Sequence, residues 1–158
     1  MNRSSSVFLR AVLVLIGVGA LAFLLWEPHV EGRNANATLF EIYFKDPFLA
    51  YAYIGSIPLF AGLYQAFKVL GYVGGGREFS HSAVKSLRTI KWCAIALVGF
   101  VVVGLAIILS NTEEDRAGGV VIGVCITFAS IVVATAMSVL ERTLQSAVEL
   151  KSESDLTV

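Results

Sequence analysis

The sequence predicts an all-α integral membrane protein that forms one domain, 1–158, with four transmembrane helices. Of its 158 residues, 56% are apolar and 15% are charged, whereas soluble domains average roughly 45–50% and about 25%. The apolar residues gather in four stretches, at 7–26, 47–70, 92–109 and 118–140. Each is close to the ~20 residues with which a helix crosses a ~30 Å hydrocarbon core. Because the backbone finds no water there, each stretch is expected to be helical.

The first stretch has the basic start of a secretory signal peptide, since Arg3 precedes it and Arg10 lies within it. The small residues that resemble a cleavage site, at 35–37, lie well beyond its end at Trp26. The apolar run is also longer than the ~7–15 residues usual in a signal peptide. We therefore expect a retained membrane anchor. Cleavage would leave three spans.

The second stretch contains Pro58, which is expected to kink it, and Gln65, the most polar residue inside a predicted span. Gln65 is expected to hydrogen-bond to another helix. The triple glycine 74–76 then ends the helix, because glycine is a poor helix former with a permissive backbone. This run fits neither a P-loop nor a dinucleotide-binding loop. We interpret 71–91 as a cytoplasmic elbow, not a phosphate site.

The third span is expected to start early, with Ser80 as its cap. His81, Lys85 and Arg88 follow at i, i+4 and i+7 on one helical face. One interpretation is that these residues only anchor the helix to anionic lipid headgroups. The alternative is that they bind a partner protein.

The fourth span is expected to continue as a helix through 141–158. A short outer loop joins it to the third span, so the two form an antiparallel hairpin whose paired positions sum to about 228. That pairing sets Arg88 beside Glu141. The sequence thus predicts a two-helix cytoplasmic stalk.

The distribution of basic residues predicts the orientation. Of the twelve Lys and Arg residues, nine lie at the end that carries both termini and the elbow, and three lie at the opposite end. We expect a multi-pass protein of the plasma membrane with both termini in the cytoplasm. A homo-oligomer is compatible with this topology.

Small residues at helical spacing predict the faces on which the helices pack. Gly55 and Gly62 mark such a face on the second span. On the fourth span the corresponding residues are Gly119, Gly123, Thr127, Ser130 and Ser138.

The sequence indicates neither an enzyme nor a cofactor or metal protein. It contains no nucleophile with an acid–base partner and no metal-ligand cluster. Cys93 and Cys125 lie at predicted depths about 20 Å apart, too far for a disulfide. A formal net charge of zero gives no general attraction to nucleic acid, so direct nucleic-acid binding is not expected.

The most distinctive segments are PLFAGLYQAFKVL, REFSHSAVKSLRTIKWCA, GVVIGVCITFASIVVATAMSVLERTLQSAVEL and the tail KSESDLTV. Together they resemble the domain-of-unknown-function 2975 family of small bacterial four-span membrane proteins, over about 47–158. The triple glycine departs from the more polar turn expected in that family. The resemblance implies no known enzymatic activity. It also implies a partner, because members are often encoded beside a small helix-turn-helix regulator of the Cro/repressor type.

Two functions are compatible with these observations. In the first, the chain is an interaction or signalling protein whose elbow, stalk and tail dock a small helix-turn-helix regulator at the membrane. In the second, it is a small permease, immunity or envelope-stress protein that acts within the bilayer through Gln65 and the aromatic outer loop around Phe40 and Tyr43. The residues expected to dock a partner are the basic Arg77, Lys85, Arg88 and Lys91 and the acidic Glu149, Glu153 and Asp155.

Overall fold

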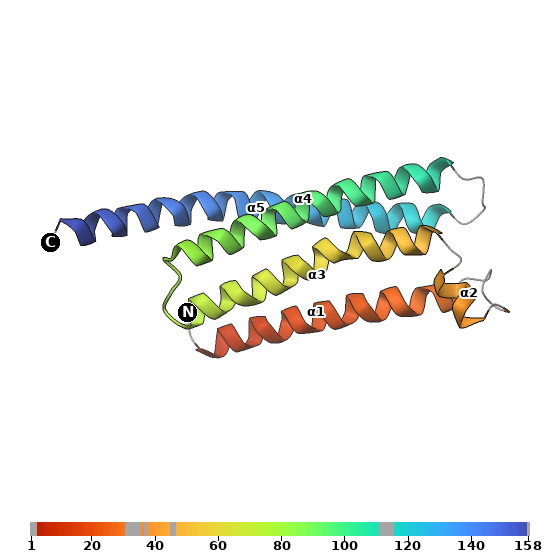
Figure 1. Cartoon of the computed structure of the whole chain (residues 1–158), viewed down its shortest axis with the longest axis horizontal. Helices are drawn as coiled ribbons and strands as arrows, with labels where there is room; N and C mark the ends of the chain where they lie inside the picture. The colour runs from red at the N-terminus through yellow and green to blue at the C-terminus, as the bar shows by residue number, and fades with distance from the viewer. Residues whose placement is uncertain (1–2, 31–35, 37, 45–46, 111–115, 158) are drawn as a thin grey trace.

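The regular structure of the protein is helical throughout the part of the chain that the computed structural model describes. Four of the helices there are long and apolar enough to cross a membrane, as the sequence predicts. They are α1 (Arg3–Val30), α3 (Pro47–Gly74), α4 (His81–Ser110) and α5 (Arg116–Leu156), and a short helix, α2 (Leu39–Phe44), precedes α3 (Figure 1). The described residues are 3–30, 36, 38–44, 47–110 and 116–157.

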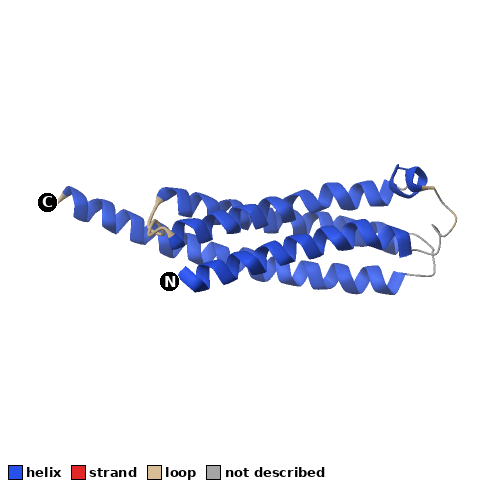
Figure 2. Cartoon of the chain, turned by 90° about the horizontal axis from the view of Figure 1, so that it is seen from below, coloured by secondary structure: helices blue, strands red, loops and turns tan. Residues whose placement is uncertain are grey.

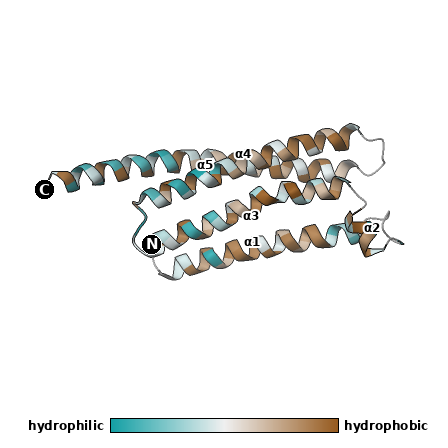
Figure 3. Cartoon of the chain, viewed as in Figure 1, coloured by the Kyte–Doolittle hydropathy of each residue, from teal (hydrophilic) through white to brown (hydrophobic). Residues whose placement is uncertain are grey.

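The long helices are arranged as a row of antiparallel neighbours. α1 packs mainly on α3, α3 on α4, and α4 on α5 (Figures 1 and 2). α1 is therefore held chiefly from one side, and most of its large apolar side chains are exposed. Hydrophobic residues predominate along most of the long helices, and hydrophilic residues gather on the last turns of α5 and the first turns of α4 (Figure 3). Such exposed apolar faces contact lipid in a protein that spans a membrane.

Glycines on α3 face α4 and allow the two helices to approach closely. A Cβ placed on Gly55 would lie 3.4 Å from Phe100 Cδ1, and one on Gly62 would lie 3.5 Å from Cys93 Cβ. The aromatic ring of Tyr51 packs on that of Phe100, with centroids 5.6 Å apart. Its hydroxyl donates a hydrogen bond to the carbonyl of Phe100 at 2.7 Å. Packing and a polar contact thus combine at the α3–α4 interface.

Glycines on α5 face α4 in the same way. A Cβ on Gly119 would lie 3.2 Å from Ile108, and one on Gly123 would lie 2.6 Å from Leu105 Cδ2. Thr127 donates its hydroxyl to the carbonyl of Gly123, on its own helix, at 2.8 Å. The remaining small residues of the predicted stripe turn away from solvent, since Ser130 is buried and Ser138 is half-buried.

Gln65 does not behave as the sequence predicts. It is half-buried in α3, and it has no side-chain hydrogen bond to any other described residue. The expected bond to another helix is therefore not formed among the described residues. The cysteines do match the prediction, because Cys93 and Cys125 are both free.

The elbow is a glycine turn that closes α3. The backbone N–H of Arg77 donates to the carbonyl of Tyr72 at 2.8 Å, and Gly76 adopts a positive φ of 68°. This is the helix-ending geometry that favours glycine, because a side chain would be strained there. Ser80 Oγ then accepts a hydrogen bond from Ala83 N at 3.2 Å, which caps α4 as predicted.

Candidate functional site

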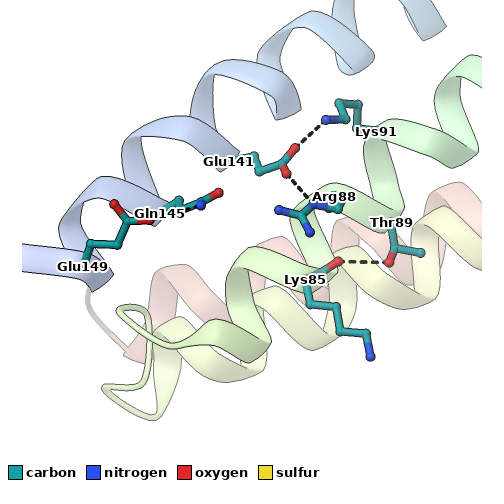
Figure 4. A network of polar contacts seen from close by, with 7 residues as sticks. All are labelled: Lys85, Arg88, Thr89, Lys91, Glu141, Gln145 and Glu149. Atoms are coloured by element: carbon teal, nitrogen blue, oxygen red, sulfur yellow. Dashed lines mark hydrogen bonds and ion pairs between the residues drawn. The ribbon is translucent and has the colours of Figure 1, made fainter. Parts of the chain in front are cut away.

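The strongest polar constellation of the described residues lies between α4 and α5, at the end of the bundle that carries the elbow. Among these residues, no group of three or more His, Cys, Asp or Glu is placed to hold a metal ion. The constellation instead consists of one carboxylate and two cations, Glu141, Arg88 and Lys91 (Figure 4). It is therefore a site of charge pairing.

Glu141 lies directly after the apolar stretch of α5, and α4 covers it. Only 8% of its side chain is exposed. Arg88 Nε donates to Glu141 Oε1 at 2.5 Å, and Lys91 Nζ donates to Glu141 Oε2 at 2.5 Å. Arg88 and Lys91 are three residues apart on α4, so one helical face presents both cations. Each carboxylate oxygen thus has its own charged donor.

The two cations favour the ionised form of Glu141. The hydrogen bonds from Lys91 and then Arg88 lower the pKa of its carboxyl, against a smaller contribution from burial that raises it. With both oxygens occupied, the carboxylate is poorly suited to accept a proton from a substrate. Its geometry fits a fixed connection between two helices.

Apolar side chains pack around the contact of Glu141 with Arg88 and Lys91, on the first turns of α4. Val84, Leu87 and Ile90 are buried on α4, and Val148 is buried on α5. A fully buried side chain of this kind stabilises a fold by about 1.5–3 kcal/mol relative to an exposed one. The predicted pairing of α4 with α5 is thus present at this end of the bundle. We call α4 from His81 to Lys91 together with α5 from Glu141 to Leu156 the stalk.

The residues expected to dock a partner fall into two groups. Arg88 and Lys91 are both bound to Glu141, whose single negative charge offsets one of their two positive charges. Lys85 points away from this cluster (Figure 4). Arg77 lies at the elbow, with its guanidinium carbon 5.8 Å from the ring centroid of Tyr72.

The acidic residues of the expected set lie on the exposed part of the stalk. Glu149 accepts a hydrogen bond from Gln145 on the same helix at 3.1 Å. Glu153 and Asp155 are exposed in the last turns of α5 and have no side-chain partner in the described chain. Two shallow grooves flank this region, one beside His81 and Lys85 and the other beside Phe79.

Sequence reasoning missed two contributors to this architecture. The hairpin pairing brought Arg88 to Glu141 but not Lys91, although its spacing of three residues from Arg88 was a usable signal. The second contributor is a pair of tyrosines on α3, Tyr51 and Tyr53. Their hydroxyls donate to the carbonyls of Phe100 and Leu24 on neighbouring helices.

Comparison with known proteins identifies the family of this chain. A family model described as protein of unknown function (DUF2975) matches residues 33–158. The chain is also 41% identical over 160 residues to the uncharacterized membrane protein YoaS of Bacillus subtilis (strain 168), with 100% of both chains covered. No solved structure matches it. The chain is therefore a membrane protein and belongs to the DUF2975 family.

Proposed function

We propose that this protein is a non-enzymatic interaction protein that holds a soluble partner at the cytoplasmic face of the plasma membrane. The observation that carries the proposal is the length of α5. Its 41 residues extend about 60 Å, twice the ~30 Å of a hydrocarbon core. The end of α5 reaches beyond the other helices (Figure 1). A rigid helix that leaves the bilayer offers a surface to a soluble protein.

The orientation of this surface rests on the basic residues. Nine of twelve Lys and Arg residues lie at the end of the bundle that carries the stalk and the N-terminus. Under the positive-inside rule this end faces the cytoplasm. The stalk and both termini are then cytoplasmic.

The charge of the stalk indicates the kind of partner. The far end of α5 carries the acidic residues Glu149, Glu153 and Asp155 and one basic residue, Lys151, so its formal charge is −3 + 1 = −2. Such a patch complements a basic surface and would increase the rate and specificity of encounter. A DNA-binding protein presents a basic surface of this type. A small helix-turn-helix regulator, the partner that the family resemblance implies, therefore fits this end best.

Site-specific photocrosslinking in native membranes tests the proposal. A photoreactive residue in place of Ser152, next to the acidic patch, is expected to capture a small helix-turn-helix protein that mass spectrometry identifies. The same residue in place of Val121, which is exposed on the apolar part of α5, serves as the control and should capture none.

Charge reversal separates specific docking from chance proximity. The triple substitution Glu149→Lys, Glu153→Lys and Asp155→Lys is expected to abolish capture at Ser152. The substitutions Arg77→Glu and Lys85→Glu test whether the elbow contributes. Crosslinks from Ser152 only to lipid or to other copies of the chain would refute the docking function and favour a role within the bilayer.

A further inference from the structure

Two basic residues, Arg10 near the start of α1 and Lys68 near the end of α3, are not paired with a carboxylate among the described residues. The guanidinium carbon of Arg10 lies 5.1 Å from the ring centroid of Phe67, and Lys68 Nζ lies 5.6 Å from that of Tyr64. Neither cation has a carboxylate or other hydrogen-bond partner in the described parts of the chain. The edge of the helix row thus carries two positive charges without a counter-ion.

The helix geometry brings these two cations to one seam. Tyr64, Phe67, Lys68 and Gly71 recur at i, i+3, i+4 and i+7, on one face of α3. A Cβ on Gly71 would lie 3.1 Å from Arg10 Nη2. The guanidinium from α1 therefore occupies the space that this glycine leaves open on the same face of α3.

The local packing fixes the position of Arg10. Ser6, one turn earlier on α1, is buried and donates its hydroxyl to the carbonyl of Leu70 at 3.1 Å. Arg10 Nε is itself buried and has no hydrogen-bond partner. Of the Arg10 nitrogens, Nε alone is buried without a partner in the described chain, so a ligand from the lipid side would bind the terminal Nη atoms.

The depth of the two cations identifies the surroundings of this seam. α1 and α3 each contain 28 residues and extend about 42 Å, the thickness of a hydrocarbon core with both headgroup layers. Arg10 and Lys68 lie about 9–11 Å from the nearer helix end, which is close to the boundary between acyl chains and headgroups. Tyr64 is 63% exposed beside them. The seam therefore opens towards the lipid.

We propose that Arg10 and Lys68 form a binding site for the phosphate of an anionic phospholipid in the seam between α1 and α3. Phosphate oxygens are strong acceptors for guanidinium and ammonium donors, and they lie at the depth that the long side chains reach. The exposed ring of Tyr64 would contact the adjoining part of the lipid. This inference concerns a different part of the molecule from the stalk and does not depend on its function.

Native mass spectrometry of the full-length protein in detergent tests this site. Phosphatidylglycerol is titrated as the anionic lipid and phosphatidylcholine as the zwitterionic one. The double variant Arg10→Gln/Lys68→Gln is expected to bind phosphatidylglycerol roughly tenfold or more weakly, because two charge-assisted contacts are lost. The matched control, Arg142→Gln/Lys151→Gln, removes the same charge from exposed positions on α5 and is expected to change binding less than about twofold.

Several outcomes of this titration would contradict the proposed site. Equal loss in the control, equal binding of both lipids, or no loss in the double variant would overturn the site. Displacement of the lipid by an equal concentration of inorganic phosphate would overturn the assignment to a lipid. If circular dichroism shows that the double variant is less helical than the wild type, the same titration is made with the single variant Lys68→Gln. It is expected to weaken binding roughly threefold, and unchanged binding would overturn the proposal.

Discussion

Arg88 and Glu141 are 53 positions apart in the sequence, yet Arg88 Nε lies 2.5 Å from Glu141 Oε1. This contact fixes the register of α4 against α5 at the point where both helices leave their apolar stretches. Lys91 contributes a second contact to the same carboxylate. One acidic residue thus aligns two helices of 30 and 41 residues.

Removal of the Glu141 charge is expected to destabilise the protein. Glu141→Gln leaves Arg88 and Lys91 without their anion. Because Arg88 remains 52% exposed, the loss should be about 1–3 kcal/mol, between the values for exposed and buried pairs. Denaturation by sodium dodecyl sulfate, followed by circular dichroism, measures it. Glu149→Gln, which loses only a contact within α5, is the control and should change stability by less than about 0.5 kcal/mol.

The same contact predicts a pH dependence. The pKa of Glu141 is lowered in the folded state by Lys91 and Arg88, so ionised Glu141 stabilises the fold above its unfolded pKa of about 4.3. That stability is lost as the pH falls through the lowered folded pKa. The stability difference between wild type and Glu141→Gln should be constant near neutrality and shrink below about pH 4. A difference that shrinks already between about pH 7 and 6 would contradict this origin.

The close approach of α4 and α5 predicts strong sensitivity at Gly123. Even a Cβ at this position would lie 2.6 Å from Leu105, so Gly123→Leu must push the helices apart. We expect a loss of about 1–3 kcal/mol, as is typical of overpacking. Gly99→Leu is the matched control, because a Cβ on Gly99 meets no atom within 4 Å. Equal stability of the two variants would show that the α4–α5 contact is looser than described.

The hydrogen bond of Tyr51 predicts a smaller effect between α3 and α4. Tyr51→Phe keeps the ring on Phe100 but removes the hydroxyl that donates to its carbonyl. The expected loss is about 0.5–1.5 kcal/mol in detergent unfolding. Tyr64→Phe alters an exposed residue and should be close to neutral. A neutral Tyr51→Phe would indicate that water or another donor replaces the bond.

The four spans and the α4–α5 register followed from local rules. Apolar length is enough to predict a membrane helix, because the bilayer sets the required number of residues. A short connection forces neighbouring helices to be antiparallel, so the pairing of Arg88 with Glu141 followed from counting residues. Ser80 and the triple glycine acted as helix start and stop signals.

The sequence alone therefore determined that four long segments are helical, that they form a membrane protein, and how the last two helices pair, whereas it did not predict the short helix α2. The tertiary structure decided which polar groups find partners. It brought Lys91 to Glu141 and Tyr51 to Phe100, and it left the side chains of Gln65 and Arg10 without a hydrogen bond in the described chain. The reason is physical: helix formation depends on neighbours in the sequence and on the solvent, whereas a side-chain contact depends on the rotation and distance of two separate helices.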